Sequence, residues 1–371
     1  MEWALIGAPW RCGNKSVSTD QNYKVATADK MIVMPFGKIL IGDGRPTMVI
    51  AEIGINHEGS VDTCALMVEA AVRAGADAVK LQTSDPDEHY LPGTPSYELY
   101  DKARLKPEET TSIFALAKKL GVEVFTTCGD MPTLDLIESL DPAGHKISSG
   151  MLVNLPMIRR FAKTGRPLIF SSGMSDLDGV TKAVKAAKMA GAEQIAVLQC
   201  TSLYPAEPQT LNLRAIRTLR EHFGTLTGFS DHSAGIEAAP LAIAAGACII
   251  ERHFTFDRSR SGFDHIVSLE PAEFAAMVAA IRRAEIIMGT GIKVPTDAES
   301  EFARRWSRRL VARRDIKARQ VISEDDLAVK RTMVEDVGLP ALAFDDVIGS
   351  IAVRDLPKFT VISQDDLRGK E

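Results

Sequence analysis

Residues 48–74 read MVIAEIGINHEGSVDTCALMVEAAVRA, an apolar run followed by a turn and a helical pattern. The first part is apolar almost throughout, which is typical of a strand that is buried on both faces. From Val61 to Ala74 the apolar residues recur at three- and four-residue spacing, which predicts an amphipathic helix. A second apolar run, AVKLQ at 78–82, follows at once. The stretch therefore predicts a strand–helix–strand unit of a parallel sheet.

The same alternation continues to about residue 290 and gives eight such units. The expected strands are Met48–Gly54, Ala78–Gln82, Glu123–Thr126, His145–Ser148, Pro167–Ser171, Ile195–Gln199, Leu226–Phe229 and Ala247–Glu251. Eight parallel strands with intervening helices favour a TIM (β/α)8 barrel over an open doubly wound sheet, which commonly has fewer strands and an early phosphate loop. The predicted fold class is α/β.

The chain has 371 residues, which is too long for one ordinary domain, and its pattern divides it into four parts. Residues 1–30 form an N-terminal extension to which no role is assigned, and residues 31–291 form the barrel domain, beginning with a hairpin at 32–45. Residues 292–306 are expected to be a linker. Residues 307–371 contain an internal repeat, DIKARQVISEDDL and DLPKFTVISQDDL, which predicts a small β-rich domain.

Composition and charge restrict the class of partner. The net charge of −5 argues against a nucleic-acid partner, which would normally require a basic excess. No run of about 18 apolar residues occurs, so no membrane span is expected. The first thirty residues lack the order of a signal peptide, and the five cysteines are scattered without paired spacing, which suits free thiols in a reducing compartment. We expect a cytoplasmic protein.

Polar residues gather where the predicted strands end, which is where the active site of a TIM barrel lies. Lys80 and Lys146 stand there among short hydroxyl side chains, a combination that suits a small phosphorylated anion. The alternative is that the lysines extend from the strand ends into solvent and the hydroxyls only cap the next helices.

Two histidines and one carboxylate suggest further chemistry at the same edge. His232 and His253 follow adjacent strands, so their imidazoles could reach one divalent cation and leave positions open for water and substrate. A purely structural role for each histidine is the alternative. Glu52 ends the first strand and could act as a general acid or base, bind a sugar hydroxyl, or support one of the lysines.

Eight strings occur in the order of a known family: AEIGINHEGS, KLQT, KISSG, SSGM, CTSLYP, GFSDHS, IERHFT and DHIVSL. Between about residues 46 and 290 the chain resembles the sialic acid synthase (nonulosonate synthase) family, and its C-terminal repeat resembles that family's antifreeze-like (SAF) domain. The resemblance implies a transferase that condenses phosphoenolpyruvate with an open-chain aldose, N-acetylmannosamine or a related N-acyl amino sugar. The product would be a sialic-acid-like nonulosonate plus phosphate, formed by C–O cleavage of a tetrahedral intermediate.

The resemblance also implies roles for individual residues. Glu52, Lys80, Lys146 and His253 would be the catalytic residues, with Glu52 as the acid/base group. His232 and His253 would ligate Mn²⁺, or Mg²⁺ or Co²⁺. The residues expected to bind phosphoenolpyruvate or the sugar are Gln82, Thr127, Ser149, Ser171, Ser202, Tyr204, Ser230 and Asp264, together with Arg331. In that family the small domain of one subunit covers the barrel of its partner, so Arg331 implies a homodimer.

The sequence departs from the family pattern on the sugar side. Met151 stands where many members carry a carboxylate that contacts sugar hydroxyls, and the stretch after Arg331 also differs. A thioether accepts hydrogen bonds poorly, so the acceptor sugar is left open. Two other functions remain: a related phosphoenolpyruvate-dependent synthase of another sugar acid, and a diverged accessory protein of polysaccharide biosynthesis.

Overall fold

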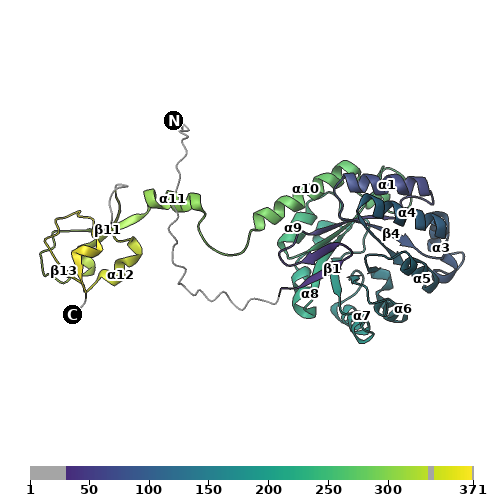
Figure 1. Cartoon of the computed structure of the whole chain (residues 1–371), viewed down its shortest axis with the longest axis horizontal. Coiled ribbons are helices and arrows are strands. Elements are labelled where there is room, and N and C mark those ends of the chain that lie inside the picture. The colour runs from purple at the N-terminus through teal and green to yellow at the C-terminus, as the bar shows by residue number, and fades with distance from the viewer. Residues whose placement is uncertain (1–30, 333–337, 370–371) are drawn as a thin grey trace. The chain divides into compact units, whose positions relative to one another are not determined.

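A computed structural model describes residues 31–332 and 338–369 of the chain (Figure 1). The predicted N-terminal extension, residues 1–30, lies outside the described residues. The chain divides into two compact units, with the boundary between Gly289 and Thr290. Each unit is described by itself.

The first unit is a closed barrel of eight parallel strands, which neighbour one another in the order β10-β3-β4-β5-β6-β7-β8-β9. The barrel strands are β3 (Met48–Gly54), β4 (Ala78–Thr83), β5 (Glu123–Cys128), β6 (His145–Ile147), β7 (Leu168–Ser171), β8 (Ile195–Cys200), β9 (Leu226–Asp231) and β10 (Ile249–His253). The predicted TIM (β/α)8 barrel is thus confirmed.

Helices surround the strands. The outer helices are α1 (Val61–Arg73), α4 (Pro107–Leu120), α5 (Met131–Ser139), α6 (Leu155–Ala162), α7 (Leu177–Met189), α8 (Ala215–Phe223), α9 (Ala238–Ala244) and α10 (Pro271–Met288). Helix α1 begins at Val61 because the Ser60 hydroxyl accepts a hydrogen bond from the Thr63 amide at 3.2 Å. Two short helices, α2 (Pro86–His89) and α3 (Pro95–Ala103), lie in the connection between β4 and α4. In the described part of the chain, no helix is long and apolar enough to cross a membrane.

A hairpin of β1 (Val33–Phe36) and β2 (Ile39–Gly42) closes the end of the barrel at which the strands begin. Phe36 and Ile41 are fully buried and pack with the first residues of the strands, such as Met48. The ring of Phe36 meets that of Phe125 edge to face, with centroids 4.9 Å apart. The hairpin therefore completes the apolar core below the strands.

The side chains that face the barrel axis change from apolar at the start of a strand to mainly polar at its end. On β3, Met48 and Ile50 belong to the lower core, and Glu52 takes the next inward position. On β4, Ala78 belongs to the same core and Lys80 follows two residues later. The same two-residue spacing leads to Thr127, Ser171, Cys200, Ser230 and Glu251 on β5, β7, β8, β9 and β10. One periodicity thus builds both the core and the polar layer above it.

The second unit has two similar halves. Strands β11 (Arg308–Ala312) and β12 (Leu327–Arg331) pair in one half, and β13 (Ile351–Ala352) and β14 (Leu367–Arg368) pair in the other. The internal repeat has a structural counterpart, because Arg314 contacts Asp326 at 2.7 Å and Arg354 contacts Asp366 at the same distance. Helix α11 (Asp297–Trp306) lies within the segment that the sequence indicated as a linker, and α12 (Phe344–Val347) precedes β13.

The cysteines of the described residues are free, as expected, and they are also buried; they are Cys64, Cys128, Cys200 and Cys248. Cys12 lies outside the described residues.

Candidate active site

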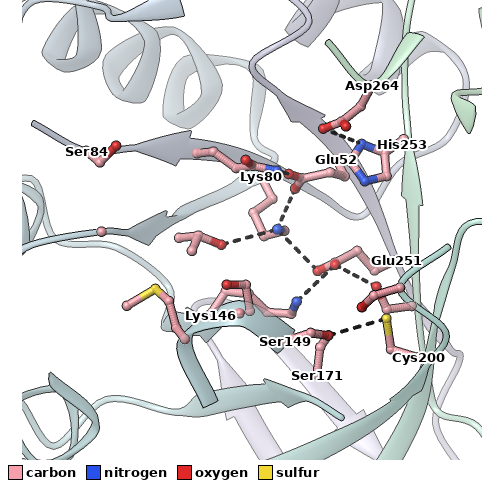
Figure 2. Close-up of a pocket in the computed structure, with 18 of the residues that line it drawn as sticks. Glu52, Lys80, Ser84, Lys146, Ser149, Ser171, Cys200, Glu251, His253 and Asp264 are labelled. Carbon is pink, nitrogen blue, oxygen red and sulfur yellow. Dashed lines mark hydrogen bonds and ion pairs between the residues drawn. The ribbon is translucent and has the colours of Figure 1, made fainter. Parts of the chain in front are cut away.

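A polar cavity of about 330 Å³ opens where the barrel strands end (Figure 2). Every candidate residue that the sequence indicated within the barrel lines it; these are Glu52, Lys80, Gln82, Thr127, Lys146, Ser149, Ser171, Ser202, Tyr204, Ser230, His232, His253 and Asp264. Arg331 is not among them, since it ends β12 in the second unit. There its guanidinium lies over the ring of Trp306, 4.8 Å from the centroid.

Two glutamates and two lysines alternate across the floor of the cavity (Figure 2). Lys80 Nζ lies 2.6 Å from Oε2 of Glu52 and 3.6 Å from Oε2 of Glu251. Lys146 Nζ donates to Oε1 of Glu251 at 3.0 Å. All four side chains are buried. Adjacent strands bring them together, since Glu52 on β3 pairs in register with Lys80 on β4.

The two carboxyl groups have opposite electrostatic environments. Burial raises the pKa of Glu52 to about 7, although Lys80 opposes the shift. Burial would also raise the pKa of Glu251, but Lys146 and Lys80 together hold it at about 2. Glu251 is therefore an ionised counter-charge, while Glu52 can exchange a proton near neutral pH. Pairs of catalytic carboxyl groups have pKa values that their surroundings separate in the same way.

Hydroxyl groups complete the end of the cavity that holds the lysines. Ser149 Oγ accepts a hydrogen bond from the Gly173 amide at 3.0 Å, and Ser230 Oγ donates to Glu251 at 3.0 Å. A Cβ atom at Gly173 would collide with the hydroxyls of Ser149 and Ser202, so glycine leaves room for both. Within the described residues, the buried Ser171 hydroxyl has no hydrogen-bond partner. This end of the cavity offers cations and donors to a phosphate group.

The histidines lie side by side at the cavity, with ring centroids 5.3 Å apart. Nδ1 of His232 lies 2.9 Å from the Thr201 carbonyl, which can only accept, so Nδ1 carries a proton and Nε2 is the nitrogen left to bind a ligand. Burial lowers the pKa of His253 well below its ordinary value. Its Nδ1 lies 3.6 Å from Oδ2 of Asp264 and has no hydrogen-bond partner in the described structure.

His232 and His253 have the donor chemistry that a divalent cation requires, because such a cation binds neutral imidazole nitrogens. Burial opposes protonation of His232, yet contacts with Cys200 and Thr201 raise its pKa, so a cation there would compete with a proton. Across residues 31–332 and 338–369, no three His, Cys, Asp or Glu side chains form a group arranged to hold a metal ion.

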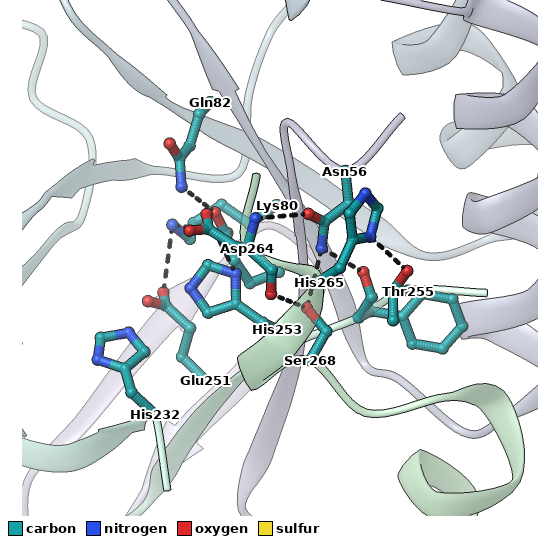
Figure 3. Close-up of polar contacts among 12 residues, drawn as sticks. Asn56, Lys80, Gln82, His232, Glu251, His253, Thr255, Asp264, His265 and Ser268 are labelled. Carbon is teal, nitrogen blue, oxygen red and sulfur yellow. Dashed lines mark hydrogen bonds and ion pairs between the residues drawn. The ribbon is translucent and has the colours of Figure 1, made fainter. Parts of the chain in front are cut away.

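A hydrogen-bond network holds the loop that follows β10 and carries Asp264 (Figure 3). Oδ1 of Asn56 accepts from the Asp264 amide at 3.0 Å, and Nδ2 of Asn56 donates to the Phe254 carbonyl at 3.0 Å and to Oγ of Ser268 at 2.9 Å. Ser268 in turn donates to the Asp264 carbonyl at 2.7 Å. Asn56 thus ties the loop after β3 to the loop after β10, and the Asp264 carboxylate faces His253.

Several lining residues had no role assigned from the sequence. Glu251 was visible as a polar residue at the end of its strand, but its contact with Lys146 spans 105 residues and leaves no local pattern. His89, Tyr90 and Tyr100 come from α2, α3 and the turn between them. Met151 also lines the cavity and is buried.

Comparisons with known proteins agree with this geometry. Residues 67–293 match the NeuB family, and residues 307–368 match the SAF domain. The N,N'-diacetyllegionaminic acid synthase of Legionella pneumophila is 35% identical over 327 residues, which cover 83% of this chain and 91% of that protein. A pseudaminic acid synthase of Campylobacter jejuni is 31% identical over 338 residues, covering 87% of this chain and 97% of that protein.

A solved structure is similar as well. The N-acetylneuraminic acid (sialic acid) synthetase of Leptospira borgpetersenii, determined in complex with citrate, superposes with a TM-score of 0.70 at 32% identity. The match covers 73% of this chain and 95% of that one. The resemblance drawn from the sequence strings is therefore confirmed, and the chain belongs to the NeuB family and carries a C-terminal SAF domain.

Proposed function

We propose that the chain condenses phosphoenolpyruvate with an open-chain aldose to give a sialic-acid-like nonulosonate and phosphate. As a member of the NeuB family it is an enzyme that forms a carbon–carbon bond, like the synthases named above. The observation that carries the proposal is the buried set of two lysines and two glutamates, in which one carboxyl stays ionised and the other has a pKa of about 7.

The lysines and the hydroxyls around them would bind phosphoenolpyruvate. In the free protein the carboxyl groups of Glu52 and Glu251 contact Lys80 and Lys146 and offset their positive charge. When the anionic substrate enters, its negative charge raises the pKa of Glu52 further. Substrate binding therefore favours the protonated form of Glu52 before the chemical step.

Glu52 donates this proton in the first step of the proposed reaction. The π electrons of the C2=C3 bond of phosphoenolpyruvate form a bond from C3 to the aldehyde carbon and leave C2 cationic, while the aldehyde oxygen takes the proton of Glu52 and becomes a hydroxyl. The ionised Glu52 then takes a proton from the water that adds at C2. In the tetrahedral intermediate the C2–O bond to phosphate breaks, the C2 hydroxyl passes its proton to the departing phosphate, and a 2-keto acid remains.

A divalent cation, Mn²⁺ or else Mg²⁺ or Co²⁺, would be held by His232 and His253. When bound, such a cation supplies Lewis-acid polarisation of the aldehyde. The donor chemistry supports this assignment, because His232 keeps Nε2 available and burial disfavours the charged form of His253.

The acceptor would be N-acetylmannosamine or a related N-acyl amino sugar. Gln82, Tyr204 and Asp264 would contact its polar groups, since all three line the cavity beside Glu52. Met151 favours an acceptor that presents an apolar group at that side, because a thioether cannot replace the hydrogen bonds of a hydroxyl.

The active form would be a homodimer in which the SAF domain of one subunit covers the barrel of its partner and lends Arg331 to the N-acyl group. A mixture of two inactive variants tests this arrangement. Arg331→Ala and Glu52→Gln each lose activity alone, and a mixed dimer regains one complete site. A mixture that stays as inactive as its parts would contradict the shared site.

An assay of phosphate release tests the proposed reaction. The purified protein is incubated with phosphoenolpyruvate, Mn²⁺ and a panel of N-acyl and unmodified aldoses. We expect phosphate release that depends on one class of sugar, together with a 2-keto acid product detected by mass spectrometry. Failure of every aldose to increase phosphate release would overturn the synthase assignment.

A further inference from the structure

A line of hydrogen bonds leads from helix α3 to the acid/base carboxyl. The hydroxyl of Tyr100 donates to Oε1 of Gln82. Nε2 of the same amide donates to Oε1 of Glu52 at 2.8 Å, and the other oxygen of Glu52 contacts Lys80. Tyr100 thus connects to the Glu52 carboxyl through one side chain only.

The space for this contact is built into β3. Gly54 has a φ of +56°, in the left-handed region that side chains rarely adopt. A Cβ atom there would lie 3.0 Å from Oε1 of Glu52 and 3.2 Å from Nε2 of Gln82. The strand register also shifts between Glu52 and Gly54. Glycine and the register shift together leave room for the Gln82 amide to reach the carboxylate.

The loop that carries Tyr100 is anchored on both sides. Helix α3 begins after Thr94, whose hydroxyl accepts from the Tyr97 amide at 3.3 Å. The loop is tied to itself by an ion pair of 3.0 Å between Arg104 and Asp85, and the Asp85 amide donates to the Asp130 carboxylate at 2.7 Å. The ring of Tyr100 packs on that of Tyr90, with centroids 4.9 Å apart. The hydroxyl is therefore held at a defined place in the cavity wall.

An amide has one donor end and one acceptor end, and rotation about its last torsion exchanges them. With the donor end toward Glu52, Gln82 stabilises the carboxylate. With the acceptor end toward Glu52, it would repel the carboxylate or take the hydrogen bond of the protonated form. A hydroxyl that donates to Oε1 favours the first arrangement, because rotation of the amide would leave the Tyr100 proton without this acceptor.

We propose that Tyr100 is a positioning residue, whose hydroxyl fixes the amide of Gln82 and, through it, the carboxyl group of Glu52 at the reacting end of the cavity. The role in turnover rests on the proposed function. The link between Tyr100 and Gln82 does not.

The decisive comparison is between Tyr100→Phe and Tyr97→Phe. Tyr97 lies on the same helix, but its hydroxyl donates to Asp87 at 2.7 Å and does not line the cavity. We expect Tyr100→Phe to lower kcat about tenfold while KM for phosphoenolpyruvate stays within about twofold, because the lysines and serines are untouched. Tyr97→Phe should behave as wild type. An equal loss in both variants would point to general disturbance of the helix and overturn the proposal.

A double-mutant cycle separates positioning from a direct role. Once Gln82→Met has removed the amide, the Tyr100 hydroxyl has nothing to hold, so adding Tyr100→Phe should lower kcat no further. Losses that multiply in the double variant would show that Tyr100 acts independently of Gln82 and would overturn the proposal.

A measurement without substrate tests the positioning role of Tyr100 separately from the proposed synthase activity. In protein labelled with ¹⁵N-glutamine, the Gln82 side-chain signal is assigned by its loss in Gln82→Met. We expect its hydrogen exchange to be at least tenfold faster in Tyr100→Phe and unchanged in Tyr97→Phe. Unchanged exchange in Tyr100→Phe overturns the positioning role even if the enzyme is active. Faster exchange in a protein that releases no sugar-dependent phosphate would leave the link standing and reject only the synthase.

Discussion

Oε1 of Glu251 lies 3.0 Å from Nζ of Lys146, and both side chains are buried at the end of the barrel where the strands finish. The same carboxylate also faces Lys80. A buried ion pair contributes little net stability, but removal of one partner is costly because the other charge is left unpaired. Glu251 therefore serves as a counter-charge to both lysines, while Glu52 makes the shorter contact with Lys80.

Glu251→Gln should lower the free energy of unfolding by about 3 kcal/mol, because Lys146 loses its counter-charge. Inorganic phosphate should restore part of this loss, and it should raise the melting temperature more in the variant than in the wild type. Calorimetry with and without phosphate measures both effects. The double variant Lys146→Met/Glu251→Gln, which keeps only the pair of Glu52 and Lys80, should recover most of the stability. Equal phosphate effects in wild type and Glu251→Gln would contradict this account.

The pH dependence of turnover should report Glu52. Its pKa in the free protein is about 7, and the first proposed step uses the protonated form. Therefore log(kcat/KM) for phosphoenolpyruvate should be level below that pKa and fall as the pH rises through about 7. In Glu52→Gln the remaining activity, lower by a factor of about 10²–10⁴, should lack this descending limb. Stopped assays across the pH range would reveal it, and a limb that persists in the variant would assign it to another group.

The barrel strands were predictable because parallel strands buried on both faces have continuous apolar sequences. The run Met48–Gly54 was placed with both of its ends correct. The strand at 249–253 was predicted two residues early, since Ala247 and Cys248 extend the apolar run without joining the strand. Strand ends also located the polar residues of the cavity, because inward positions recur every second residue.

The connection that carries α2 and α3 has no continuous apolar run of this kind in its sequence. These helices are short, and each begins with a proline after a polar cap, so the segment reads as a loop. Tyr100 was missed for this reason. The charge state of Glu52 could not be read from sequence either, because it depends on burial and on Glu251, which lies about 200 residues away in the chain.

The histidine pair makes a prediction for metal binding. Titration of the protein with Mn²⁺, followed by the loss of the free-ion signal in electron paramagnetic resonance, should show one bound ion per chain. His232→Ala and His253→Ala should each weaken binding at least tenfold, since each removes one imidazole ligand. His89→Ala is the matched control, because His89 also lines the cavity but its ring meets that of Tyr90 edge to face, in the connection between β4 and α4. Binding that survives both substitutions would place any metal elsewhere.

Met151 should determine which acceptor sugars the enzyme prefers. Its side chain is buried in the cavity wall, so a sugar hydroxyl placed against it loses a hydrogen bond to water and gains none. Wild type should therefore prefer acceptors with a deoxy or N-acyl group at that position over N-acetylmannosamine. Met151→Glu supplies an acceptor for the hydroxyl and should shift the ratio of kcat/KM values toward N-acetylmannosamine by about 10–200-fold. Met151→Leu, which keeps the volume and the apolar character, should leave the ratio unchanged.

Competition assays with paired sugars measure the ratio directly. If Met151→Glu and Met151→Leu give the same ratio, the side chain at this position does not contact the sugar, and the choice of acceptor must be made by residues on other strands.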